Sequence, residues 1–231
     1  MLGSLISALS NPGSAEFKAL IIELALSLPI IILSLSVHET AHGYAAYKLG
    51  DPTARNLGRL SLNPMKHLDP IGFICMLLCG FGWAKPVPIN TRYFKRPKRD
   101  MALTGIAGPV SNLLLAVIFA ILFGISYRWY FANFFSLNQS MVNIMDILLT
   151  FLQIGMSINI TLAVFNLIPI PPLDGSRLLF AFAPSKIYWK IMQYEQYIYI
   201  GFMLLLFLGV LDRPIYYLSS LVLRLIVNIF V

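Results

Sequence analysis

The sequence predicts an all-α polytopic membrane protein with about five to six transmembrane helices and one short re-entrant element. Of its 231 residues, 58% are hydrophobic and only 12% are charged, whereas soluble domains carry roughly 25% charged residues. Several apolar runs are long enough to cross ~30 Å of hydrocarbon. The basic residues collect mainly in the segments between these runs, as is usual for proteins that cross a bilayer repeatedly.

Six apolar runs follow one another along the chain. Residues 71–84 form the shortest of them, and this glycine-containing run is too short to span the membrane as a straight helix. We therefore expect it to enter and leave by the same face. No stretch has the composition of a separate soluble domain, so residues 1–231 are predicted to form a single domain. The six runs cover residues 18–49, 71–84, 101–127, 141–168, 188–211 and 215–231.

The formal net charge of +7 predicts orientation in a lipid bilayer rather than nucleic-acid binding. Loops rich in Lys and Arg stay on the cytoplasmic side of a membrane, and the basic segment 85–100 is the richest. By contrast, the aromatic segment 128–141 has one Arg and no Lys, and we expect it outside. The basic residues of the predicted cytoplasmic segment are Lys85, Arg92, Lys95, Arg96, Lys98 and Arg99.

The motif HETAH, residues 38–42, lies near the end of the first run. His38 and His42 are four residues apart and therefore share one helix face, which suits two imidazoles binding one Zn²⁺. Glu39 is turned by about 100° from His38 and can act as the general base of a hydrolytic site. Such motifs also arise by chance, but ionisable residues at membrane depth are costly and tend to be functional.

A hydrolytic zinc site needs a third protein ligand and an open position, and three side chains qualify by type: His67, Asp69 and Asp174. Asp174 follows the proline-rich end of the fourth run, "NLIPIPPLDG", residues 166–175. Prolines break helices, so the chain can fold back here. Irregular backbone at membrane depth is tolerated where it is buried in protein or lines a wet cavity.

Three motifs, taken in order, resemble the site-2 protease family of intramembrane zinc metalloproteases: HETAH, "GPVSN" at 108–112, and "NLIPIPPLDG". The resemblance covers about residues 20–185 and leaves C-terminal helices at about 186–231. The segments "LNPMKHLDPIGF" at 62–73 and "GWAKPVPIN" at 82–90 are similar to the compact prokaryotic branch without a PDZ domain, which implies a prokaryotic cell (inner) membrane. The orientation expected from the basic segments places the active site near the cytoplasmic side.

The resemblance also implies one Zn²⁺ per chain and assigns roles to individual residues. His38, His42 and Asp174 would bind zinc, Glu39 would be the catalytic base, and Asn166 would stabilise the oxyanion of the scissile carbonyl. The small residues of GPVSN would allow close helix packing. His67 is left open: it is a loop histidine, faces substrate or supports the site, or occupies the open zinc position.

The expected activity is hydrolysis of peptide bonds within or near transmembrane segments of a membrane-bound substrate. A clamp for that substrate is predicted in "KPVPIN", residues 85–90, where prolines favour extended backbone. Val87 and Ile89 would pair with an unwound substrate strand. Two other classes stay open, a metal transporter and a catalytically inactive helix-binding protein. The sequence indicates neither the substrate nor the oligomeric state.

Overall fold

The computed structural model describes residues 14–72, 75, 82–184, 190–191 and 193–231. Within these residues the protein is helical, and its only strand-like pairing is one antiparallel bridge between Leu68 and Ala84. The helices are α2 (Ala15–Lys48), α3 (Thr53–Asn56), α5 (Pro97–Asn133), α6 (Gln139–Asn166), α7 (Asp174–Phe182), α9 (Glu195–Phe207) and α10 (Asp212–Phe230), with 3₁₀ turns at Pro64–Lys66, Thr91–Tyr93 and Phe134–Ser136.

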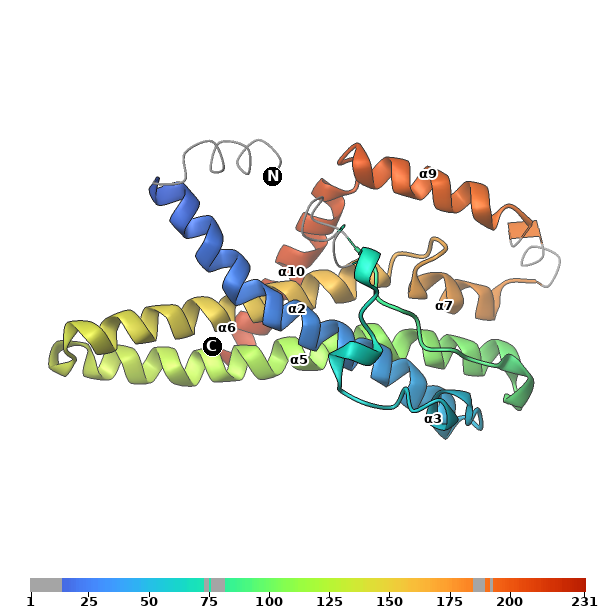
Figure 1. The fold of residues 1–231 in the computed structure, drawn as a ribbon, viewed down its shortest axis with the longest axis horizontal. Coiled ribbons are helices and arrows are strands. Elements are labelled where there is room, and N and C mark those ends of the chain that lie inside the picture. The colour runs from blue at the N-terminus through green and yellow to red at the C-terminus, as the bar shows by residue number, and fades with distance from the viewer. Residues whose placement is uncertain (1–13, 73–74, 76–81, 185–189, 192) are drawn as a thin grey trace.

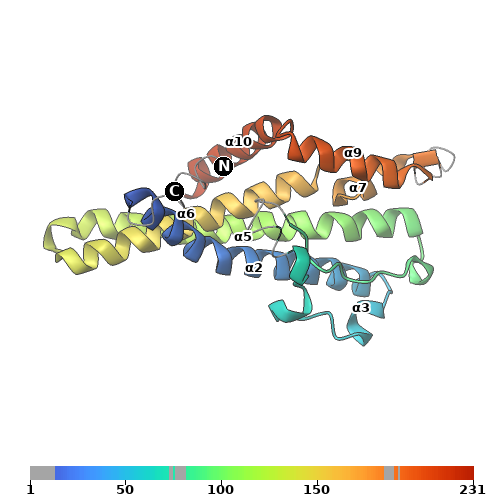
Figure 2. The same ribbon diagram turned by 45° about the horizontal axis from the view of Figure 1, so that its top comes forward.

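Helices α5 and α6 form a long antiparallel hairpin that is the centre of the fold (Figure 1). Helix α2 packs across this hairpin, and Figure 2 shows α10 on the opposite side of it from α2. The core between α5, α6 and α10 is apolar. It consists of Ala116, Phe119, Ala120, Leu152, Met156, Ile160 and Ile226.

Gly155 explains how α5 and α6 come so close. A Cβ at this position would lie 2.5 Å from the ring of Phe119, which is shorter than atoms of real side chains approach. The glycine therefore lets the aromatic ring pack directly on the α6 backbone. Small residues at such crossings are typical of helices that associate in a membrane, where van der Waals packing stabilises the contact.

Four helical segments in the described part of the chain are long and apolar enough to cross a membrane: Phe17–Lys48, Pro97–Ser136, Gln139–Asn166 and Asp212–Phe230. They correspond to four of the predicted runs. The predicted span 188–211 contains α9, which has 13 residues and rises about 20 Å, and residues 188, 189 and 192 of this run lie outside the described residues. The predicted re-entrant run 71–84 lies largely outside the described residues.

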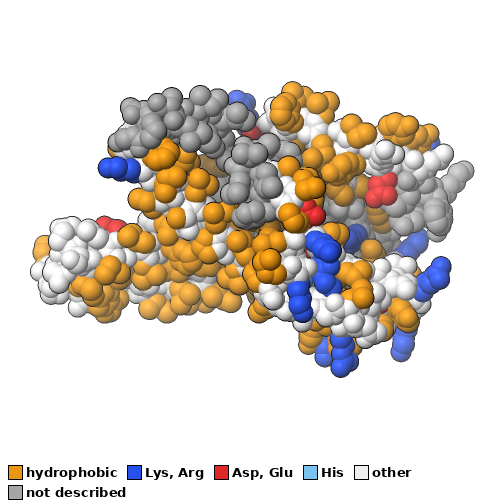
Figure 3. All heavy atoms as spheres, in the orientation of Figure 1, with side chains coloured by type: hydrophobic (Ala, Val, Ile, Leu, Met, Phe, Trp, Pro, Cys, Tyr) orange, Lys and Arg blue, Asp and Glu red, His pale blue; other side chains and the backbone are white. Residues whose placement is uncertain are grey.

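Hydrophobic side chains cover the outer surface of the bundle, whereas most Lys and Arg side chains visible in Figure 3 gather toward the end that holds α3. On α5, for example, Leu114, Ile118 and Ile125 are more than half exposed. A large apolar surface of this kind is unusual for a soluble monomer but matches a lipid environment. This surface and the four long apolar helices support the predicted membrane location.

Candidate metal centre

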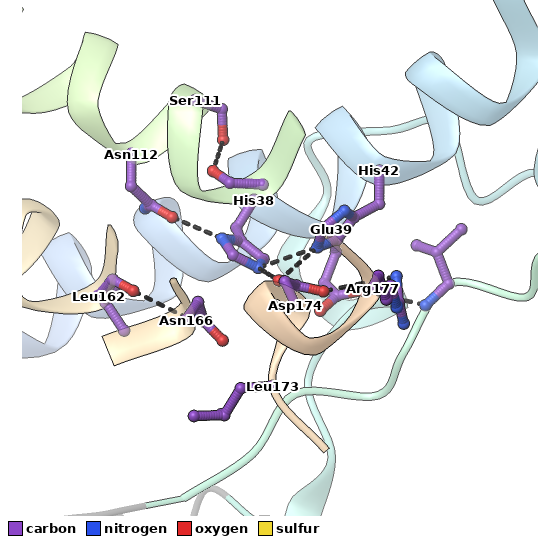
Figure 4. Close-up of polar contacts among 12 residues, drawn as sticks. His38, Glu39, His42, Ser111, Asn112, Leu162, Asn166, Leu173, Asp174 and Arg177 are labelled. Atoms are coloured by element: carbon purple, nitrogen blue, oxygen red, sulfur yellow. Dashed lines mark hydrogen bonds and ion pairs between the residues drawn. The ribbon is translucent and has the colours of Figure 1, made fainter. Parts of the chain in front are cut away.

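Three side chains converge at the crossing of α2, α5 and α7 (Figure 4). The Nε2 atom of His38, the Nε2 atom of His42 and the Oδ2 atom of Asp174 lie 3.0 Å from one another in each pair. All three residues are buried. Among the described residues they are the group of His, Cys, Asp and Glu side chains whose ligand atoms are close enough to hold one metal ion.

The two histidines reach this point because α2 is continuous through the HETAH motif. Residues four apart lie on one face of a helix, and the rings of His38 and His42 meet edge to face with centroids 4.6 Å apart. Helix α5 packs against the same face. A Cβ on Gly108 would lie 2.5 Å from Nε2 of His42 and 2.6 Å from Nε2 of His38, so only glycine leaves room for both imidazoles.

Asp174 arrives from the other side because the chain folds back after α6. Helix α6 ends at Asn166, and three prolines follow before Asp174 opens α7. The turn is tight, because a Cβ on Gly175 would overlap with the carbonyl oxygen of Leu167. The proline break therefore delivers a carboxylate to the histidines across 136 residues of sequence.

Hydrogen bonds behind the two imidazoles determine which nitrogen faces the site. His42 donates from Nδ1 to the backbone carbonyl of Thr104 at 2.7 Å. His38 has Nδ1 2.5 Å from Oδ1 of Asn112. Because these partners are acceptors, each Nδ1 carries the hydrogen of a neutral ring, and each Nε2 presents a lone pair.

Three electron-rich atoms at 3.0 Å therefore face one another without a proton between them, and a cation relieves their repulsion. The donor set fits zinc, which takes imidazole nitrogen and carboxylate oxygen at about 2.0–2.2 Å in tetrahedral sites. Ligand atoms of such a tetrahedron are separated by about 3.3 Å, which follows from these bond lengths. The observed triangle is close to that spacing, so these three residues would hold zinc.

A guanidinium beside Asp174 favours the charged carboxylate, which is the form that binds a metal. The guanidinium Nη1 of Arg177 is 3.4 Å from Oδ1 of Asp174. The carboxylate thus directs Oδ2 to the histidines and Oδ1 to a neighbouring cation.

Glu39 lies beside the three ligand groups and is not one of them (Figure 4). Its Oε2 accepts a hydrogen bond from the backbone N–H of Val87 at 2.9 Å. Asn166 ends α6, and its Nδ2 donates to the carbonyl of Leu162 at 2.9 Å. An amide nitrogen carries two hydrogens, so the contact with Leu162 uses one of them and leaves the other.

His67 is fully buried but is separate from the ligand cluster. Its Nε2 lies 2.6 Å from the carbonyl of Ser61 and 3.4 Å from Oγ1 of Thr40. Its backbone carbonyl accepts from the N–H of Lys85 at 2.7 Å. In this structure His67 therefore connects the loop before it to α2 and to the segment that carries Val87, and Asp174 stands in the third-ligand position.

Residues 85–90, called the strap below, run extended beside α2. Val87 is buried and Ile89 half-buried. Arg59 donates from Nη2 to the carbonyls of Lys85 and Pro86 at 2.7 and 3.2 Å. The N–H of Asn90 is bound by Oδ2 of Asp51 at 2.7 Å. The predicted clamp thus has a defined position next to Glu39, but the N–H of Val87 is already used by that residue.

The sequence interpretation did not identify the two groups that orient the imidazoles. Asn112 was assigned to helix packing, and the structure places its side chain against His38. A buried amide in the middle of an apolar span was the available signal, since polar groups at that depth need a partner. The Thr104 contact uses a backbone carbonyl, which no residue type reveals.

The fold and the site together define a class: a helical membrane protein with a buried zinc-type centre of two histidines and a carboxylate, and a glutamate beside it. The chain belongs to peptidase family M50, the site-2 protease family, whose model matches residues 26–208. It is therefore a zinc metalloendopeptidase, as the sequence predicted. This membership also confirms the predicted all-α membrane fold.

Curated relatives agree with this assignment. The chain is 45% identical over 175 residues to "Putative zinc metalloprotease YwhC" of Bacillus subtilis, covering 76% of this chain and 77% of that protein. It is 31% identical over 150 residues to the similarly described Rip2 of Mycolicibacterium smegmatis, covering 62% and 52%. A zinc metalloprotease of Methanocaldococcus jannaschii is 27% identical over 157 residues, covering 68% and 34%. No solved structure gives a significant match.

Proposed function

We propose that this protease hydrolyses peptide bonds within or near transmembrane segments of membrane-bound substrates, with His38, His42 and Asp174 holding the zinc. The position of the ligand cluster carries this proposal. His42 lies six residues before the end of α2 at Lys48, which is about 9 Å along the helix. Because α2 is a membrane-length apolar helix, the site is below the membrane surface and near one face.

The residues around the cluster have distinct roles in this proposal. Zinc, when bound, supplies a Lewis acid for the scissile carbonyl and lowers the pKa of water. Glu39 takes a proton from the attacking water and returns it to the nitrogen of the leaving strand. Asn166 donates its remaining N–H to the carbonyl oxygen as negative charge develops there.

A transmembrane helix hides its peptide bonds in internal hydrogen bonds, so a substrate must unwind before cleavage. Its freed N–H and C=O groups then need partners at membrane depth. The strap offers an extended backbone for this pairing. Since the Val87 N–H is bound by Glu39, the carbonyl of Val87 and the backbone groups of Ile89 are the partners that we assign to the substrate.

We also propose an orientation. The basic segment 85–100 includes the strap and precedes α5, and it faces the cytoplasm by the positive-inside rule. The zinc site then lies near the cytoplasmic side of a prokaryotic cell membrane. The aromatic turn after α5, which includes Phe134–Ser136, lies on the opposite side because α5, with 37 residues, rises about 55 Å.

Comparison of membrane peptides from cells with the wild-type chain and with Glu39→Gln tests the function. We expect fragments whose new ends lie within predicted membrane spans in wild-type cells, and their uncut precursors in the variant. Purified enzyme should generate the same ends in proteoliposomes. New ends found only in soluble loops and domains would contradict intramembrane cleavage, while the chain would still be a metalloprotease.

A cross-linker at position 89 tests the clamp separately. Photo-reactive residues at 89 and, as a matched control, at the exposed position Tyr93 are compared in the Glu39→Gln background with a bound substrate. Cross-links at 89 and none at 93 are expected. Cross-links elsewhere around the site with none at 89 would remove the clamp.

A further inference from the structure

The imidazole of His38 is the end of a chain of side-chain amides buried between three helices. Oδ1 of Asn112 on α5 contacts Nδ1 of His38 at 2.5 Å. Nδ2 of Asn112 donates to Oδ1 of Asn159 on α6 at 3.0 Å. Nδ2 of Asn159 donates to the backbone carbonyl of Gly155 at 2.8 Å. Both asparagines are fully buried, so water does not compete for these contacts.

The backbone fixes the direction of every hydrogen bond in this chain. The carbonyl of Gly155 can only accept, so Asn159 must present Nδ2 to it and Oδ1 to Asn112. Nδ2 of Asn112 lies between this oxygen and the carbonyl of Ser34, 3.4 Å away. Rotating either amide by 180° would place oxygen against oxygen in a buried site, and buried polar groups left without partners are costly.

These fixed hydrogen-bond directions determine which ring nitrogen of His38 faces Asp174 and His42. Since only Oδ1 of Asn112 can face the ring, Nδ1 of His38 must carry the hydrogen, and the lone pair of Nε2 is directed at Asp174 and His42. His42 is oriented differently, because its partner is the carbonyl of Thr104. One imidazole is therefore held by the backbone, and the other depends on side chains that substitution can remove.

We propose that Asn112 and Asn159 are positioning residues that fix the tautomer and ring orientation of His38 for zinc binding, with Asn159 acting through Asn112. The inference rests on the proposed ligand role of His38. Groups behind metal-binding histidines typically change metal affinity or activity by about 10–100-fold when they are mutated. Asn112 touches the ligand and lies in this range, whereas Asn159 is one step further away and has a smaller effect.

The test is the zinc dissociation constant of detergent-purified protein, measured by competition with a chelator on the folded fraction. Asn112→Leu removes the acceptor and should weaken zinc binding by about 10–100-fold. Asn112→Asp keeps an oxygen for Nδ1 of His38 but places its second oxygen against Oδ1 of Asn159, so it should bind zinc more tightly than Asn112→Leu and less tightly than wild type. Ser111→Ala is the matched control, because its hydroxyl donates within α5 to Gly108 and takes no part in the chain.

A structural role alone would give a different pattern. It would lower the thermal stability of the metal-free protein and leave the dissociation constant of the folded fraction within about 2-fold of wild type, well short of the loss expected for an orienting group. Equal affinities for Asn112→Leu and Asn112→Asp would also overturn the proposal. If wild type binds zinc but His38→Ala does so equally well, the ligand assignment itself fails, which separates the two hypotheses.

Asn159→Leu supplies a second test, which can be used even if Asn112→Leu does not fold. It should weaken zinc binding by at least about 3-fold, since removing a partner of an orienting group has part of the effect of removing that group. Because Asn159 acts through Asn112, the double variant Asn112→Leu/Asn159→Leu should bind zinc no more weakly than Asn112→Leu. If the two single-variant effects on the dissociation constant multiply in the double variant, Asn159 does not act through Asn112. Wild-type zinc affinity of Asn159→Leu would exclude the role of Asn159 as well.

Discussion

The carboxylate of Glu39 accepts a hydrogen bond from the backbone N–H of Val87 at 2.9 Å. The residue assigned as catalytic base and the strap assigned to the substrate are thus in direct contact. This contact couples the orientation of the base to the position of the strap. A substrate strand that binds beside Val87 therefore arrives next to the group that handles the proton.

Replacement of Glu39 separates its chemistry from its structural contact. Glu39→Gln should retain about one zinc per chain and lose roughly 10²–10⁴-fold in turnover, the usual contribution of a positioned base. The glutamine oxygen can still accept from Val87. Glu39→Ala should lose turnover equally and, in addition, speed amide hydrogen exchange in the strap. Activity of Glu39→Gln within a few-fold of wild type would mean that another group moves the proton.

The third zinc ligand can be identified by comparing three alanine variants. Asp174→Ala should lower the zinc content most, because its Oδ2 is 3.0 Å from both Nε2 atoms. Asp69→Ala is the matched carboxylate control, since its Oδ1 accepts from the backbone N–H of Gly72. Metal analysis of purified protein gives the order. A larger loss in His67→Ala than in Asp174→Ala would show that the ligand assignment is wrong.

A single methyl group at Gly108 should disrupt the centre. In Gly108→Ala the new carbon would lie 2.5 Å from His42 and 2.6 Å from His38, so the imidazoles must move, and zinc affinity should fall at least ~10-fold, as it does when ligand orientation is lost. Gly201→Ala is the control, because a Cβ there would have no neighbour within 4 Å. That change should be neutral or stabilise α9 by about 0.5–1 kcal/mol. Equal zinc affinities in both variants would refute the close approach.

Cysteine labelling tests the proposed orientation. Single cysteines are placed at Thr91 and Ser136, which lie near opposite ends of α5. Cys75 and Cys79 are changed to serine in this background. An impermeant thiol reagent added to intact cells should label position 136 and leave position 91 unlabelled until the membrane is opened. Labelling of 91 alone in intact cells would invert the topology, and labelling of both would contradict a single crossing by α5.

The sequence predicted those parts of the molecule that follow from local patterns. Hydropathy located the four long spans, because each is a continuous apolar run. Helical periodicity placed His38 and His42 on one face, and the prolines before Asp174 indicated the turn that carries it back. The structure brings these three residues together as the sequence interpretation expected.

Other features depend on how distant segments pack, and local patterns do not contain that information. The Asn112 side chain gained its role only from the crossing of α2 over α5 and α6. The prolines of the strap predicted an extended backbone, but not that Glu39 would accept a hydrogen bond from the N–H of Val87.

The separation of 136 residues between His38 and Asp174 has a consequence for biosynthesis. A nascent chain inserts α2, with both histidines, before Asp174 has been translated. At about 5–20 residues per second the interval is on the order of 10 s. During this time the growing chain lacks one of the three residues of the metal site. The order of translation thus delays completion of the site until α7 has been made and Asp174 reaches the two histidines.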